Sequence, residues 1–321
     1  MSSSLVAEST SADEGFHHQA FFYAGENEFV AGASAFVVEA VAAREPVLVV
    51  VSARKIDLLR QRLGSATDEV VFADMEAVGT NPARIIPAWT QFVSGFGDRR
   101  LRGIGEPIWA ERSAAELAEC QRHEALLNVA FSDSAGFTLM CPYDTESLTA
   151  EVMDEARRNH PYLRDDGREW ASDEYPGTDA FLGPFSAPLP EPPSVSAEVG
   201  FGARSLGGLR SLVRDRAVAA GFGEERASDA AAAVNEVASN SVRHGGGQGV
   251  LRIWADADTL ICEVSDDGRI DEPLVGRTRP PIDARGGRGL WMVNHLCELV
   301  QVRSLATGTT VRMHIRRLPP R

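Results

Sequence analysis

The chain has 321 residues and a formal net charge of −14, from 32 lysines and arginines against 46 aspartates and glutamates. Hydrophobic residues make up 44% of it and charged residues 24%, which are globular proportions and exclude long disorder or fibrous structure. This length suits two domains of about 100–200 residues each. Because an acidic surface repels phosphate backbones and anionic lipid, we expect protein partners or small ligands rather than nucleic acid or a membrane.

The N-terminus has no basic segment followed by an apolar one, and the densest apolar run, Val47 to Val51, is too short to span a bilayer. We therefore expect a cytoplasmic protein. Residues 1–14 have the small, polar composition of a disordered tail. The cysteines are widely separated and form no CxxC pair, which predicts buried reduced thiols and indicates neither a disulfide framework nor a structural zinc site. They are Cys120, Cys141, Cys262 and Cys297.

Strands and helices alternate along residues 15–163. Strands are expected at 19–24, 46–52, 69–73, 101–104 and 137–141, and helices at 28–43, 53–63, 83–93, 114–130 and 147–159. This order predicts an α/β domain with a doubly wound, largely parallel sheet. Ligands of such sheets bind at the carboxyl ends of the strands.

A proline-rich stretch over residues 164–200 predicts a semi-rigid linker, and the order of elements changes after it. Within residues 201–318 we expect helices at 203–220, 224–243 and 289–300, and strands at 249–255, 259–264, 302–305 and 310–316. Helices gathered on one face of a mixed or antiparallel sheet form a two-layer α+β domain.

Two motifs in this second domain carry oxygen donors. Glu236 and Asn240 lie four residues apart on one helical face, and His244 extends that line by another turn. A carboxylate beside an amide can act as a base and a ligand for Mg²⁺, which prefers hard oxygen donors. Asp266 ends a strand and Gly268 follows it, so the carboxylate could accept from an exocyclic amine such as that of adenine while the glycine admits the ring.

Two further motifs are rich in glycine. Gly286, Gly287 and Gly289 lead directly into a helix, whose bare N–H groups and positive dipole end suit a phosphate chain. Gly308 and Thr310 lie where the last turn meets the closing strand. Four such motifs in this order within one α+β domain indicate a nucleotide-binding site.

These motifs carry a family resemblance over about residues 204–316. NEVASNSVRH resembles the N box, SDDG the G1 box and GGRGL the G2 box of the GHKL (Bergerat-fold) ATPases and kinases, and the segment looks most like the RsbW-like anti-sigma-factor serine kinases. The resemblance implies ATP and Mg²⁺ as cofactors, with Glu236 as general base and Asn240 as the metal ligand. The ATP-binding residues that it implies are Asn240, Arg243, His244, Asp266, Gly268, Gly286, Gly287, Arg288, Gly289, Leu290 and Thr310.

The same resemblance implies a serine/threonine protein kinase that phosphorylates an anti-sigma antagonist protein of the STAS type and alternately sequesters a sigma factor. The precedent of the family suggests a homodimer. Two alternatives remain open. The second glycine that the G1 box usually carries is replaced by Ile270, which stiffens the hinge of the lid and favours a non-catalytic ATP-binding interaction protein. A histidine kinase would need a phosphoacceptor, for which His123 is the candidate.

The first domain has a resemblance of its own, carried by HHQAFFYAGENEFV, EPVLVVVSARKIDLLRQRL, GIGEPIW and HEALLNVAF. These segments resemble the DcmR-type sensory (MEDS) domain, a RecA/KaiC-like sheet without a P-loop. The single lysine, Lys55, has no glycine near it, so the usual phosphate-binding P-loop is absent. The resemblance implies sensing of a small organic molecule, while His17 and His18 could equally belong to the exposed tail. Candidate pocket residues at strand ends are Tyr23, Ser52, Asp74, Glu106, Trp109 and Cys141.

Overall fold

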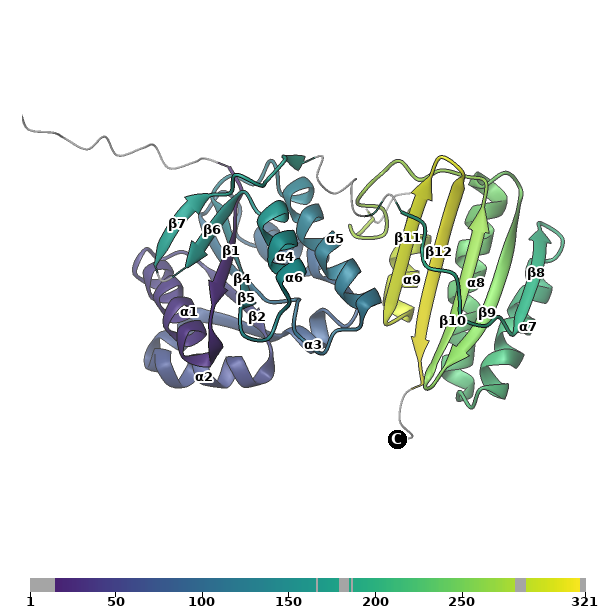
Figure 1. Cartoon of the computed structure of the whole chain (residues 1–321), viewed down its shortest axis with the longest axis horizontal. Helices are drawn as coiled ribbons and strands as arrows, with labels where there is room; N and C mark the ends of the chain where they lie inside the picture. The colour runs from purple at the N-terminus through teal and green to yellow at the C-terminus, as the bar shows by residue number, and fades with distance from the viewer. Residues whose placement is uncertain (1–14, 166, 179–184, 186, 281–286, 318–321) are drawn as a thin grey trace, which may run out of the picture.

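The structure is a computed structural model that describes residues 15–165, 167–178, 185, 187–280 and 287–317. The predicted tail at residues 1–14 lies outside the described residues. Figure 1 shows two sheets, each with its own helices, side by side along the long axis of the molecule. Within the described residues, no helix is both long enough and apolar enough to cross a membrane.

The first domain is built on a seven-stranded sheet with the strand order β3-β2-β4-β5-β1-β6-β7. Neighbouring strands run parallel except β6 and β7, so the predicted α/β class with a largely parallel sheet is confirmed. The strands are β1 (His17–Tyr23), β2 (Val47–Val51), β3 (Val70–Asp74), β4 (Leu101–Gly105), β5 (Phe137–Asp144), β6 (Tyr162–Asp165) and β7 (Arg168–Ala171).

Helices cover both faces of this sheet, because its central strands are apolar on both sides. In β2, Val47, Val49 and Val51 belong to one buried cluster, while Leu48 and Val50 belong to another. The first cluster packs against α1 (Gly25–Ala42) and α2 (Ala53–Leu63). The second packs against α3 (Met75–Val78), α4 (Ile85–Ser94), α5 (Ala114–Ala130) and α6 (Ala150–Asn159). Short 3₁₀ turns, η1 (Gly64–Glu69) and η2 (Pro82–Arg84), complete the connections.

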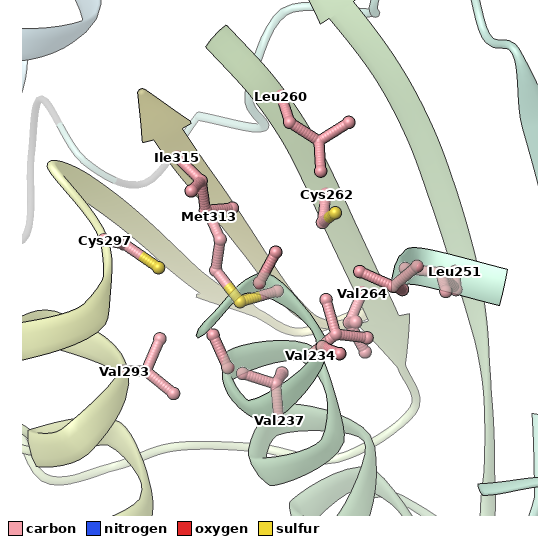
Figure 2. Packing of buried hydrophobic residues seen from close by; sticks show 14 of the residues in the cluster. Val234, Val237, Leu251, Leu260, Cys262, Val264, Val293, Cys297, Met313 and Ile315 are labelled. Carbon is pink, nitrogen blue, oxygen red and sulfur yellow. The ribbon is translucent and has the colours of Figure 1, made fainter. Parts of the chain in front are cut away.

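The second domain is a two-layer α+β unit, as predicted. Its antiparallel sheet has the order β11-β12-β10-β9-β8, with β8 (Ala197–Gly202), β9 (Gln248–Asp256), β10 (Thr259–Asp266), β11 (Leu299–Leu305) and β12 (Gly308–Arg316). The helices α7 (Leu206–Ala219), α8 (Glu224–His244) and α9 (Arg288–Leu296) lie on one face of it. Figure 2 shows Val234 and Val237 of α8 directed at Cys262, Val264 and other apolar side chains of the sheet. This apolar packing fixes the positions of α8 and α9 on the sheet.

Two predicted segments differ from the structure. The stretch expected to be a linker contains β7 and most of β8, each hydrogen-bonded to a neighbouring strand. The helix expected over residues 289–300 ends at Leu296, because Leu299 and Val300 pair with His314 and Met313 as the start of β11.

Candidate functional site

The N-box side chains lie directly under the start of α9. Glu236 and Asn240 stand half-buried on one face of α8, whose alanine-rich opposite face packs into the core. A Cβ atom at Gly289 would lie 3.1 Å from Asn240 Nδ2 and 3.3 Å from Glu236 Oε2. A glycine at this position therefore lets the backbone of α9 approach both polar side chains closely.

A cavity of about 470 Å³ opens beside this contact, and Glu236 and Arg288 both line it. Gly287 precedes α9 with φ +82°, a backbone conformation that favours glycine. The first N–H groups of an α-helix have no partner within the helix, so this end of α9 attracts anions. The remaining lining residues are Arg279, Pro280, Trp291 and Met292.

Asp266 is held in one orientation at the end of β10. Its Oδ2 accepts from Ser241 Oγ at 2.5 Å, and its Oδ1 accepts from the backbone N–H of Gly268 at 2.7 Å. A Cβ atom at Gly245 would lie 2.4 Å from Asp266 Cγ. The end of α8 can therefore approach the G1 segment this closely only because residue 245 is a glycine. The structure thus brings the carboxylate of the G1 box against the helix that carries the N box.

The closing strand presents a different threonine from the one predicted. Thr310 pairs with Ser265, and the two hydroxyl oxygens lie 3.1 Å apart. Thr309 pairs with Asp266, so the side chains of these two residues point to the same face of the sheet, which is the face that Ser241 of α8 contacts. Thr310 therefore points to the opposite face, and Thr309, whose Oγ1 donates to Gly268 O at 2.9 Å, replaces it in the candidate site.

The remaining predicted ATP-binding residues differ in how far they are exposed to solvent. Arg243 is exposed and donates from Nη2 to Asn240 Oδ1 at 3.0 Å, on the oxygen expected to bind the metal. His244 is exposed in the last turn of α8, whereas Leu290 is buried in the core. Gly286 lies outside the described residues.

A second cavity, of about 560 Å³, lies at the carboxyl ends of the strands in the first domain. Four of the predicted pocket residues line it, namely Tyr23, Ser52, Glu106 and Trp109. Lys55, which was not predicted to lie in the pocket, also lines it. Of the other predicted pocket residues, Asp74 and Cys141 are not in its lining. Asp74 accepts from the N–H of Glu76 at the start of α3, and Cys141 is buried within β5.

A largely buried ion pair lines this cavity. Lys55 Nζ lies 2.5 Å from Glu106 Oε1, which also accepts from Tyr23 Oη at 2.7 Å. Burial raises the pKa of Glu106, and the neighbouring ammonium group of Lys55 opposes that shift. Other polar residues of the lining are Arg54, Glu76, Glu111, Asp144 and Ser147. The cavity therefore suits a small polar ligand that can exchange hydrogen bonds with a carboxylate, an ammonium and a phenol.

Comparison with known families identifies both domains. Residues 17–161 match the family model described as MEDS, the MEthanogen/methylotroph, DcmR Sensory domain. Residues 202–315 match the model of the histidine kinase-like ATPase domain. The chain carries a MEDS domain and a histidine kinase-like ATPase domain. The 560 Å³ cavity lies in the MEDS domain, and the N-box, Asp266 and α9 contacts lie in the ATPase domain.

No curated protein matches the chain. A crystal structure of the RsbU and RsbW domains of a Mycobacterium tuberculosis protein is 19% identical, with a TM-score of 0.29. That match covers 39% of this chain and 34% of the other, so the chain spans about a third of its length.

A buried ionic cluster joins the MEDS domain to the ATPase domain. Glu119 of α5 accepts from Arg303 Nη1 of β11 at 2.7 Å and from Arg277 Nη2 at 3.1 Å, and all three side chains are almost fully buried. Arg122 of α5 also donates to Val302 O at 2.8 Å. Because Arg277 lies between β10 and α9 in the sequence, this cluster holds part of the segment that joins them against the MEDS domain.

The MEDS domain also holds the C-terminal end of α9. Arg84 Nε donates to Asn294 O at 2.8 Å, and Asn81 Nδ2 donates to Cys297 O at 3.2 Å. Carbonyls at a helix C-terminus lack helical partners and favour a cation nearby, so both donors stabilise the helix. The helix whose first turn covers the N box is therefore fixed at its other end by the MEDS domain.

The acceptor needed by a histidine kinase is poorly placed. His123 lies within α5 with an exposed fraction of only 1%. A side chain this buried cannot reach a phosphate donor unless the structure around α5 opens locally. The structure therefore gives no support to His123 as a phosphoacceptor.

The surroundings of His314 in β12 should make the stability of the ATPase domain depend on pH. Burial, aided by Arg312, lowers the pKa of His314 to about 4, from 6.5 for an exposed histidine. As the pH falls below 6.5 the unfolded chain takes up a proton that the folded chain refuses, so stability is lost between pH 6.5 and about 4. The unaltered protein should lose about 2 kcal/mol of unfolding free energy through this histidine at pH 5, and His314→Gln should not show that loss. Urea unfolding at pH 7 and pH 5 measures this, and an equal loss in both proteins would contradict it.

Proposed function

We propose that this signalling regulator binds Mg·ATP in its ATPase domain and transfers the γ-phosphoryl group to a serine or threonine of a separate protein. The observation that carries the proposal is the contact of Gly289 with Glu236 and Asn240, since it combines a carboxylate, an amide and a helix N-terminus in one small space. These are the donors that phosphoryl transfer requires: a proton acceptor, a metal ligand and groups that bind phosphate.

The donor set fits Mg·ATP. Asn240 Oδ1 has two lone pairs, so one can accept the hydrogen bond from Arg243 while the other binds a hard cation. When bound, Mg²⁺ would neutralise charge on the phosphate oxygens during transfer. The N-terminal N–H groups of α9 and Arg288 would bind the phosphate chain, and Asp266 would accept from the adenine amine. Glu236 would take the proton of the attacking hydroxyl group.

We infer the partner class from the sequence motifs, which resemble those of the RsbW-like kinases. The substrate would be an anti-sigma antagonist of the STAS type, and the same surface would alternately bind a sigma factor. The MEDS domain would control this exchange, since its side chains contact both Arg277, between β10 and α9, and the end of α9. A small polar molecule in the 560 Å³ cavity would be the signal.

A second candidate, an ATP-binding protein that acts only through protein contacts, is favoured by Ile270. Its N–H donates to Ser304 Oγ at 2.8 Å, and its side chain packs against the ATPase core. A glycine there would leave the segment before the lid freer, so this arrangement supports slow lid movement and slow turnover. Both candidate functions require ATP binding, but only the kinase transfers the phosphoryl group to another protein.

Substitutions in the N box separate the candidates. Asn240→Ala should weaken Mg·ATP binding at least tenfold because it removes the metal ligand, whereas Glu236→Gln should bind ATP but transfer no phosphate because it cannot accept the proton. Calorimetric titration of ATP with and without Mg²⁺ measures binding, and radiolabelled ATP with a panel of STAS antagonists measures transfer. Asn235→Ala, on the same helix, is the matched control.

Each outcome decides one part of the proposal. Metal-dependent binding that is lost only in Asn240→Ala supports the nucleotide site, and labelled antagonist supports the kinase. Binding without transfer to any antagonist favours the interaction protein. An Asn240→Ala variant that binds Mg·ATP as tightly as the unaltered protein would overturn the assignment of the N box.

A further inference from the structure

Four side chains with metal-binding atoms meet in the interior of the MEDS domain. They are His18 of β1, Glu124 of α5, Cys141 of β5 and His160, the residue that follows α6. Each is at most 1% exposed, and the four ligand atoms all lie within 4.8 Å of one another. His18 is thus not part of an exposed tail, and Cys141 belongs to this cluster rather than to the 560 Å³ cavity.

Hydrogen bonds fix which ring nitrogen of each histidine faces the centre. His160 Nδ1 lies 2.8 Å from Ala156 O, and a backbone carbonyl can only accept, so Nδ1 carries the hydrogen. His18 Nδ1 lies 3.0 Å from Asn128 Oδ1. The amide group of Asn128 is oriented by its Nδ2, which donates to Asn159 O at 2.8 Å, so His18 Nδ1 must also be the donor. In the neutral rings, both Nε2 atoms then carry lone pairs.

The cluster therefore brings acceptors together. His18 Nε2 lies 3.2 Å from Glu124 Oε2 and 3.3 Å from Cys141 Sγ, and His160 Nε2 lies 3.3 Å from Glu124 Oε2. His160 Nε2 and Glu124 Oε1 have no hydrogen-bond partner in their buried setting. A single thiol proton can satisfy one of these pairs only. Buried lone pairs that face one another are unfavourable unless a cation lies between them, so the centre suits a bound cation.

We propose that these four residues form a site for a divalent transition metal of the zinc type. Two imidazole nitrogens, one thiolate and one carboxylate are donors that Zn²⁺ accepts in tetrahedral geometry, whereas Mg²⁺ and Ca²⁺ prefer oxygen alone. Bonds of about 2.1 Å place tetrahedral donors about 3.4 Å apart. The three separations given above are close to this value, and all the donor atoms lie within 4.8 Å of one another. Asn128 and the Ala156 carbonyl are the outer partners that orient metal-binding histidines.

The site lies on the helix that contacts the ATPase domain. Glu124 follows Glu119 by five residues, which is about 140° around a helix. One side of α5 therefore binds the metal while another holds Arg277 and Arg303. With four protein ligands the coordination is closed, so the metal has a structural role and fixes α5 against β1 and β5.

The untagged full-length protein tests this proposal by its metal content and by cobalt titration after treatment with a chelator. We expect one metal ion per chain by mass spectrometry, and one equivalent of Co²⁺ with the visible bands of a tetrahedral site and a thiolate-to-cobalt charge-transfer band. Cys141→Ser should lose that band. The matched control is Cys120→Ser, a buried thiol of the same domain outside the cluster, which should keep it.

Asn128→Ala retains all four ligands, so it should keep the spectrum and bind Co²⁺ about 10–100-fold more weakly. Circular dichroism shows whether Cys141→Ser folds. If it does not fold, the Co²⁺ affinity of Asn128→Ala tests the proposal instead. The proposal is overturned if the unaltered protein holds less than a stoichiometric amount of metal and binds no Co²⁺. It is equally overturned if a folded Cys141→Ser protein keeps the charge-transfer band.

Discussion

Replacing Glu119 with glutamine is expected to weaken the contact between the MEDS and ATPase domains by about 3–5 kcal/mol, because two buried guanidinium groups lose their counter-charge. Arg277 and Arg303 are 4% and 6% exposed, so water cannot replace the carboxylate. Arg122 Nη1, 3.8 Å from the same carboxylate, adds a third positive charge. Burial already lowers the pKa of Arg277 to about 10, with a further contribution from Arg122.

Scanning calorimetry measures this effect as the separation of one thermal transition into two, since loss of the contact lets each domain unfold alone. Arg316→Gln is the matched control. It removes another ion pair across the same interface, to Glu116 at 2.7 Å, but the Arg316 side chain is 49% exposed. An exposed pair contributes at most about 1 kcal/mol. Equal thermal profiles for Glu119→Gln and Arg316→Gln would show that the buried cluster does not couple the domains.

The sequence predicted helices well where their signals are local. The helices at Ala53–Leu63 and Ala114–Ala130 have the predicted bounds, and each begins after a serine that caps it, Ser52 and Ser113. The N box was predictable for the same reason, since the spacing of Glu236 and Asn240 places them on one face of any helix.

Features that depend on distant pairing were not predictable. The early end of α9 follows from the pairing of Leu299 with His314, which an apolar sequence does not encode locally. The orientation of Thr310 depends on its register with Ser265, because a shift of one residue turns each side chain to the other face. The proposed metal site was not predictable because β1, α5, β5 and the residue after α6 each supply one ligand, without the short spacing of known zinc motifs.

Gly308→Ala should damage both the fold and the nucleotide site of the ATPase domain. Gly308 has φ +130°, and a Cβ atom there would lie 2.2 Å from Asp266 O and 3.4 Å from Asp267 Cα. These are backbone atoms, which cannot move aside as a flexible side chain could. Overpacking costs about 1–3 kcal/mol and a forced backbone conformation about as much again, so we expect a loss of about 2–6 kcal/mol.

The same displacement should weaken ATP binding at least tenfold, because β12 can admit the methyl group only by separating from the end of β10 that carries Asp266. Gly208→Ala is the matched control: it lies in α7 with open space around its Cβ position, so alanine should stabilise the helix by about 0.4–1 kcal/mol. Urea unfolding and ATP titration of both variants measure the two effects. If Gly308→Ala binds ATP as tightly as Gly208→Ala, then Asp266 does not hold the adenine, and the carboxylate serves only to join α8 to the sheet through Ser241.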